Sequence, residues 1–174
     1  VAMLFDECTP YPCEPVDAEK SLDLTLRWAR RCRDWIDKNQ PMTGGGKQLH
    51  FGIVQGSTYE ELRQRSAREL VAMGFDGYAI GGLSVGEPER DMMRIADWVC
   101  PLLPERQARY AMGLGTPPQI VELIARGIDM FDCVLPTRLA RNGTAFTAEG
   151  TINLRNARYA RDFSPISEDT HPLC

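Results

Sequence analysis

The feature that most constrains the fold is a regular alternation of short apolar runs and amphipathic segments. Apolar runs begin near residues 49, 77, 108 and 130, and a loop and a helix-like segment separate each from the next. A strand followed by a helix every roughly 20–30 residues is typical of parallel β/α architecture. The spacing alone does not distinguish a closed barrel from an open sheet.

The two ends of the chain add to this pattern. The opening run VAMLF stops at Asp6, as a buried strand entering a loop would, and a start within a strand suggests that an N-terminal part is missing. Residues 143–154 alternate around Glu149-Gly150 and predict a β-hairpin. We therefore expect one incomplete domain over 1–174, with β/α units in 1–136 and the hairpin in 137–174.

Three short motifs mark where helices are expected to begin. Ser57 with Glu60 and Ser84 with Glu87 have the spacing of helix capping boxes. Thr116 can cap a further helix that Pro117 opens.

Composition narrows the class of protein. No apolar run is long enough to cross a membrane, and no signal peptide is recognisable at the start, so a cytoplasmic protein is expected. The six cysteines suggest no disulfide framework and are expected to be free thiols. Residues 106–161 hold eight Arg, no Lys and four acidic residues, within a chain of net charge −4. This basic segment is either a phosphate-binding face or a solvated surface.

Residues capable of binding a ligand follow every predicted strand. In chain order they are Asp6 with Glu7 and Cys8, Gln55, Gly81-Gly82-Leu83, Met112-Gly113, and Asp132 with Cys133. Loops at the carboxyl ends of parallel strands gather around one pocket. Carboxylate and amide groups match the edges of a flat heterocycle, glycines let backbone amides approach it, and Met offers a polarizable face. The pattern predicts a purine-like ligand.

Each of these residues also has a purely structural interpretation. Asp6 or Asp132 can cap a helix, Gln55 can be solvated, and Met112 can belong to the core. His50 precedes an apolar strand and is interpreted as a packed residue without a role. Recurrence at five strand ends, not any single residue, favours a site.

Several strings carry a resemblance to a known family. FDECTPYP, FGIVQGS, GFDGYAIGGLSVGE, YAMGLGTP and GIDMFDCVLPTRLARNG occur in this order. Together they resemble bacterial tRNA-guanine transglycosylases, and the match spans nearly the whole chain. The resemblance implies an α/β fold, a (β/α)8 TIM-type barrel, of which this chain covers the later strands and helices, followed by a β-hairpin leading toward a zinc-binding subdomain.

The resemblance also implies a reaction. The family exchanges guanine at the anticodon wobble position of tRNA for the base preQ1 (7-aminomethyl-7-deazaguanine), in queuosine biosynthesis, through a covalent aspartyl-ribose intermediate. The aspartate of FDCVLPTR, Asp132, would be the nucleophile. The family's other catalytic aspartate, in an upstream Ser-Gly-Gly loop, has no counterpart here, so this polypeptide alone is expected to be inactive.

The same resemblance assigns the residues that bind the base. Asp6 would bind its N1 and exocyclic amine edge, and Gln55 and the Gly82 amide its O6. The Leu83 carbonyl would accept from the aminomethyl group, and Met112 with Gly113 would pack on the base face. Cys8 and Val85 match the bacterial pocket that accepts preQ1.

Partners follow from the resemblance as well. Arg138 and Arg141 would contact phosphates of a tRNA with a GUN anticodon, whose target base must leave its stack. A homodimer and a structural zinc are expected in the complete protein. The family's Cys-x-Cys-x2-Cys and later His are not complete here. Either Cys174 opens a cysteine cluster that continues beyond residue 174, or Asp169, His171 and Cys174 occupy three ligand positions and the fourth ligand is missing.

Two other functions remain open. A non-catalytic tRNA-binding subunit of the same fold would be expected to lack the nucleophile, and Asp132 in its full motif argues against it. A retaining barrel glycosidase could use Asp6 and Asp132 as its two carboxylates. Gln55 and the glycine pair would then have no evident purpose.

Overall fold

The computed structural model describes residues 1–166. The chain divides into two compact units, the first from Val1 to Asp132 and the second from Cys133 onward.

The first unit is built on a five-stranded parallel sheet. Its strands are β1 (Ala2–Met3), β4 (His50–Val54), β5 (Gly77–Ile80), β6 (Ala108–Ala111) and β7 (Met130–Phe131). They are paired in the order β1-β4-β5-β6-β7, and every pair is parallel. The predicted parallel sheet and the four predicted strand starts are confirmed.

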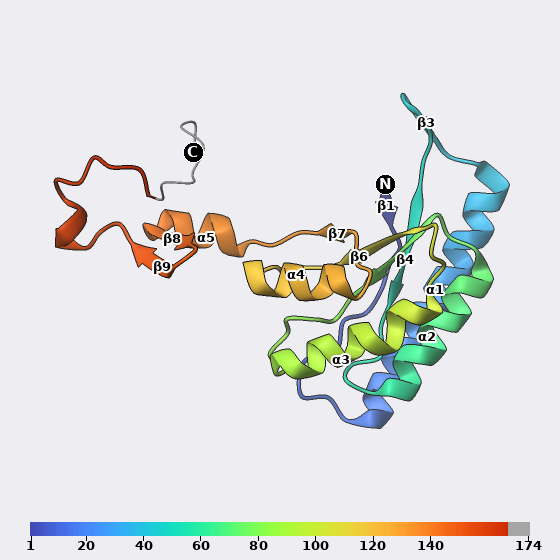
Figure 1. The fold of residues 1–174 in the computed structure, drawn as a ribbon. Coiled ribbons are helices and arrows are strands. Elements are labelled where there is room, and N and C mark those ends of the chain that lie inside the picture. The colour runs from blue at the N-terminus through green and yellow to red at the C-terminus, as the bar shows by residue number, and fades with distance from the viewer. Residues whose placement is uncertain (167–174) are drawn as a thin grey trace. The chain divides into compact units, whose positions relative to one another are not determined.

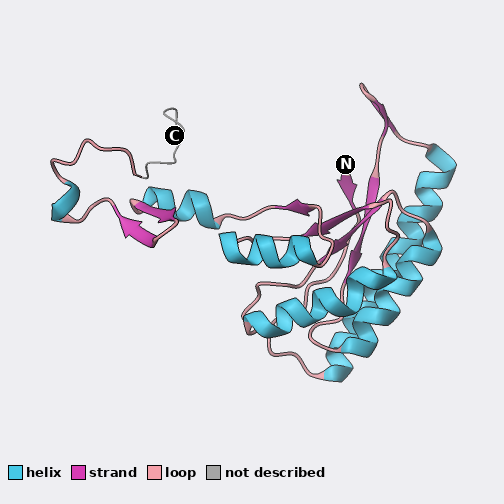
Figure 2. Ribbon diagram, viewed as in Figure 1, coloured by secondary structure: helices cyan, strands magenta, loops and turns pink. Residues whose placement is uncertain are grey.

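Four helices connect these strands and lie along one side of the sheet (Figures 1 and 2). They are α1 (Pro15–Asn39), α2 (Glu60–Met73), α3 (Glu89–Val99) and α4 (Pro117–Ala125). The strand order never reverses, so right-handed crossovers place every helix on the same face. A doubly wound sheet would have helices on both faces. The unit therefore has the organisation of part of a β/α barrel, which the spacing alone could not decide.

The core lies between the sheet and this helical layer. Leu22, Leu26 and Ala29 of α1 are buried, as the helical pattern predicts. The buried face of α2 combines polar and apolar side chains, since it contains Arg63 and Ser66 beside Ala67 and Leu70. Between α1 and β4, β2 (Met42–Thr43) and β3 (Gly46–Lys47) form a small antiparallel hairpin.

The helix starts differ from two of the three predictions. Helix α2 begins at Glu60, with Tyr59 and not Ser57 at the N-cap position, so the prediction of a capping box at Ser57 is wrong. Helix α3 begins at Glu89, because residues preceding a proline disfavour helical backbone and Pro88 follows the second motif. The third prediction is confirmed, since Thr116 precedes Pro117 at the start of α4 and its amide donates to the Gln119 side chain at 3.0 Å.

The second unit contains α5 (Leu135–Arg141), β8 (Thr144–Thr147) and β9 (Gly150–Asn153), then a 3-10 turn at Ala157–Tyr159. Strands β8 and β9 pair in antiparallel fashion, which confirms the predicted hairpin. Within residues 1–166, no helix has both the length and the apolar character that a membrane span requires.

Candidate active site at the carboxyl ends of the parallel strands

The sheet register places the predicted residues in one row. Val54 pairs with Ile80, Ile80 with Ala111, and Ala111 with Phe131. The next residue of each strand is therefore level with its neighbours, and these residues are Gln55, Gly81, Met112 and Asp132. Asp6 follows β1, which pairs with β4 at the same edge of the sheet.

Asp6 and Gln55 form a polar pair in this row. Gln55 is 2% exposed, and its Nε2 donates to Oδ2 of Asp6 at 2.6 Å. The backbone amide of Gln55 donates to the Ser66 hydroxyl of α2 at 3.1 Å. Because the backbone of Gln55 is anchored to α2 and its side-chain amide is bonded to Asp6, the two side chains present a fixed pattern of donors and acceptors.

The two glycines beside this pair have no room for side chains. A Cβ at Gly81 would lie 2.6 Å from Ile53 and 2.7 Å from Gln55 Nε2. At Gly82, where φ is +63°, it would lie 2.5 Å from Gln55 Oε1. Glycine is required for both the close approach and the backbone conformation.

The loop that follows the glycines is braced by a carboxylate. Leu83 is buried, while Ser84 and Val85 are exposed. The Glu87 carboxylate accepts from the backbone amides of Ser84 at 2.5 Å and Val85 at 2.9 Å. The second capping motif thus stabilises a loop, not a helix start.

The segment that carries Cys8 is fastened to α1. The Glu7 amide donates to the Thr25 hydroxyl at 2.9 Å, and the Ser21 hydroxyl donates to the Glu7 carbonyl at 3.2 Å. Partial desolvation and the nearby Asp6 carboxylate raise the pKa of the Cys8 thiol, so the neutral thiol is favoured.

Asp132 is exposed and accepts two short hydrogen bonds on the same oxygen. The Tyr110 hydroxyl donates to Oδ1 at 2.6 Å, and the Gly113 amide donates to it at 2.7 Å. These bonds, the first above all, hold the pKa of Asp132 below its usual value. Burial and the bond to Asp132 raise the pKa of Tyr110 to about 12. At neutral pH the pair is a carboxylate with a neutral phenol donor.

Met112 and Gly113 lie between the two clusters in the row. Met112 is half-buried, and its amide donates to the Ile80 carbonyl at 3.4 Å. Gly113 has φ +73°, with no atom within 4 Å of the position of a Cβ. It turns the backbone so that its amide reaches Asp132.

Sequence reasoning did not single out Arg63 or Tyr110. Arg63 shares its helix face with Ser66, Ala67 and Leu70, so helical spacing would have placed this cation in the core. Tyr110 pairs with Met130, and Asp132 lies two residues beyond Met130 on the same face of the sheet. That relation depends on the register, which the sequence does not specify.

The remaining predicted residues lie in the second unit. Arg138 and Arg141 are exposed on α5. The metal candidates Asp169, His171 and Cys174 lie outside the described residues. Among residues 1–166, no three His, Cys, Asp or Glu side chains are placed to hold a metal ion.

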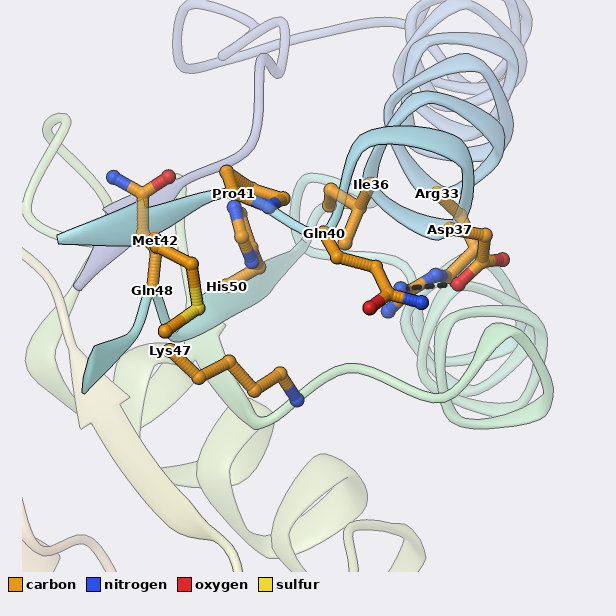
Figure 3. Close-up of a pocket in the computed structure, with 9 residues that line it drawn as sticks. All are labelled: Arg33, Ile36, Asp37, Gln40, Pro41, Met42, Lys47, Gln48 and His50. Carbon is orange, nitrogen blue, oxygen red and sulfur yellow. Dashed lines mark hydrogen bonds and ion pairs between the residues drawn. The ribbon is translucent and has the colours of Figure 1, made fainter.

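A cavity of about 380 Å³ lies at the opposite end of β4 (Figure 3). The end of α1, the β2–β3 hairpin and the start of β4 line it, with Arg33 donating to Asp37 at 2.5 Å and His50 buried in its wall. None of the predicted site residues lines this cavity, so we assign no chemistry to it.

Comparison with known proteins is consistent with this geometry. The family described as Queuine tRNA-ribosyltransferase matches residues 1–174. Queuine tRNA-ribosyltransferase of Pelotomaculum thermopropionicum is 57% identical over 97% of this chain and 44% of its own length. Proteins of the same name from Shewanella sp. (strain ANA-3) and Pasteurella multocida are 55% and 53% identical, over 95% and 97% of this chain. The chain spans less than half the length of these relatives, and it belongs to the queuine tRNA-ribosyltransferase family.

Proposed function

We propose that this chain is the nucleophile-bearing part of a tRNA-guanine transglycosylase, which exchanges the wobble guanine of tRNA for preQ1. The observation that carries the proposal is the Asp132 carboxylate, exposed and held ionised by Tyr110 and Gly113. Membership of a family whose relatives are named queuine tRNA-ribosyltransferase supports it.

In the proposed reaction, Asp132 attacks C1′ of the target ribose. A bond forms between the carboxylate oxygen and C1′ while the C1′–N9 bond breaks, and the electron pair leaves with guanine. The hydrogen bonds from Tyr110 and Gly113 both end on Oδ1, so Oδ2 is the oxygen expected to attack. The incoming base then displaces Asp132 from the vacated side, and two displacements retain the configuration at C1′.

The base pocket is proposed to be the Asp6–Gln55–Gly82 cluster. The Asp6 carboxylate would accept from N1 and the exocyclic amine, and Gln55 and the Gly82 amide would donate to O6. The bond between Gln55 and Asp6 supports this arrangement, because it keeps the amide nitrogen directed to the same side as the acceptor. The Leu83 carbonyl would accept from the aminomethyl group of preQ1, and Cys8 would lie in the same pocket. Met112 and Gly113 would contact the face of the base.

The tRNA contacts are proposed to come from α5. Arg138 and Arg141 are exposed and, among the described residues, form no ion pair with a carboxylate, so both can bind phosphates. We further propose the full (β/α)8 barrel, a structural zinc, a homodimer, tRNAs with a GUN anticodon and a cytoplasmic setting for the complete protein.

Two alternatives predict different results. A tRNA-binding subunit without activity would bind tRNA but exchange no base. A retaining glycosidase would hydrolyse simple glycosides, for which the glycine pair beside Gln55 offers no evident use.

The test is exchange of labelled guanine into unmodified tRNA by the complete gene product, beside an Asp132→Asn variant. We expect exchange by the parent and a loss of more than about 10³-fold in the variant, because the amide is a poor nucleophile. Unchanged tRNA binding by the variant is the control for folding. Binding without exchange by the parent would favour the subunit alternative.

A further inference from the structure

A buried arginine lies directly behind the proposed base pocket. Arg63 is 0% exposed, and its guanidinium donates to four backbone carbonyls. Nε donates to Ser57 at 2.7 Å, Nη1 to Val54 at 2.9 Å and to Gly81 at 2.7 Å, and Nη2 to Gly82 at 3.2 Å. Within residues 1–166 no carboxylate forms an ion pair with it, so the carbonyl dipoles are its direct partners, and the charge of Glu87, outside ion-pair distance, adds to its stabilisation.

The guanidinium remains charged in this environment. Burial lowers the pKa of Arg63 to about 10, which still leaves the side chain protonated at neutral pH. A buried unpaired cation is costly, and a neutral residue would fill the same helix position at lower cost. The carbonyls that Arg63 binds include both glycines of the pocket, which connects the charge to the site.

The contacts with Gly81 and Gly82 determine the direction of the adjacent amides. In a trans peptide, the carbonyl and the amide that follows it point in opposite directions. Since the Gly81 carbonyl points at Arg63, the Gly82 amide of the same peptide points away from Arg63. The Gly82 carbonyl also points at Arg63, so the Leu83 amide points away from Arg63 as well. A cation bound to the carbonyl also polarises the peptide and makes its amide a stronger donor.

We propose that Arg63 is a positioning residue that orients and polarises the Gly82 amide toward the carbonyl oxygen of the purine base. The inference rests on the proposed base exchange. When the C1′–N9 bond breaks, the charge left on N9 spreads through the ring to that oxygen, and a pre-oriented donor stabilises it. Arg63 therefore favours purines with a 6-oxo group over those without one.

The test compares guanine with 2-aminopurine, which lacks the 6-oxo group, as competitors in the exchange assay of the complete gene product. The parent prefers guanine, and Arg63→Gln lowers that preference by about tenfold because the donor loses its cation. Arg63→Lys, which keeps the charge, restores part of the preference. Arg65→Gln, on the same helix but partly exposed and paired with Asp23, is the matched control and leaves the preference unchanged.

If Arg63 had a merely structural role, its replacement would lower the exchange of both bases equally. An unchanged preference in the Arg63 variants therefore overturns the inference. Failure of the parent to exchange guanine overturns the proposed function instead. Should both Arg63 variants fail to fold, NMR of glycine-labelled parent protein tests the contact between the Gly82 amide and the 6-oxo group, which the inference requires. The Gly82 amide proton is expected to move downfield with guanine and not with 2-aminopurine, and equal movement with both overturns the inference.

Discussion

At the scale of single residues, Asp132 combines access to solvent with stabilisation of its charge. Two donors on Oδ1 hold the carboxylate ionised while its other oxygen is available. A carboxylate with a lowered pKa is a weaker nucleophile per molecule but is fully deprotonated at neutral pH. Tyr110 therefore controls the pH range in which Asp132 can act.

Replacing Tyr110 with Phe tests this control. Loss of the phenol donor raises the pKa of Asp132 toward its usual value, so the acidic limb of the exchange–pH profile moves to higher pH. At neutral pH the carboxylate is ionised in both proteins, so the position of the acidic limb, and not the rate at neutral pH, reports the lost bond. Tyr159→Phe, in the second unit, serves as the control. An acidic limb that stays in place would show that Tyr110 does not govern Asp132.

The sequence indicated which residues lie at the carboxyl ends of the strands, but not which groups bind them. Asp6, Gln55, Gly81, Met112 and Asp132 could be placed at this edge because each directly follows an apolar run. The hydroxyl that binds Asp132 depends on the β6–β7 register, and the role of Arg63 depends on how α2 packs behind the sheet. Neither relation is local in sequence.

At the scale of elements, the loop from Gly81 to Glu87 is determined by backbone requirements. Its glycines lie against Gln55, and Glu87 binds two of its amides. The capping motifs at Ser57 and Ser84 predicted helix starts that the structure does not have, because a motif of four residues carries no information on the residues that follow it. In the second, Glu87 still binds the Ser84 amide as in a capping box, but Pro88 delays the helix.

Gly82→Ala is expected to weaken base binding by more than tenfold, because its Cβ would lie 2.5 Å from Gln55 Oε1. Gly74→Ala is a matched control, since Gly74 also has positive φ, +77°, and no atom within 4 Å of a Cβ. Both variants carry similar backbone strain of about 1–2 kcal/mol. Calorimetric titration with guanine measures the difference. Equal affinities in the two variants would contradict a pocket at Gly82.

The hairpin end of β4 offers a test of stability. Asp76 accepts from Lys47 Nζ at 2.7 Å and from the His50 amide at 2.9 Å. Burial raises the pKa of Asp76, but these bonds outweigh it and hold the pKa below the usual value.

Asp76→Asn is therefore expected to lower the free energy of unfolding by about 1 kcal/mol at neutral pH. Because the folded-state pKa is depressed, this contribution is present above the unfolded-state pKa and disappears as pH falls through the folded-state value. Urea denaturation of parent and variant at neutral and acidic pH measures it. A difference that grows on acidification would contradict the assignment.

At the scale of the whole molecule, the strand order favours a barrel-like arrangement over a doubly wound sheet, a choice that the spacing of the strands left open. An order that never reverses puts all helices on one face, as in a barrel. Spacing predicts that strands and helices alternate, but it carries no information on which strands are neighbours. The zinc candidates Asp169, His171 and Cys174 remain predictions.

The dependence of tRNA affinity on salt concentration tests whether the basic segment of residues 106–161 binds phosphates. Each of Arg138→Ala and Arg141→Ala is expected to weaken tRNA binding and to reduce the slope of log affinity against log salt by about 1, because one phosphate contact is lost. Arg90→Ala, an exposed arginine of α3, is the control. Unchanged slopes in both α5 variants would assign these arginines to a solvated surface.

The proposed base exchange requires that Asp132 become covalently bound to tRNA. The most direct measurement incubates the complete gene product with unmodified tRNA without free base, denatures the mixture and separates protein from protein–tRNA adduct, with Asp132→Asn in parallel. We expect an adduct in the parent, attached at Asp132 by peptide mapping, and none in the variant. An adduct that persists in the variant, or maps to another residue, would contradict it.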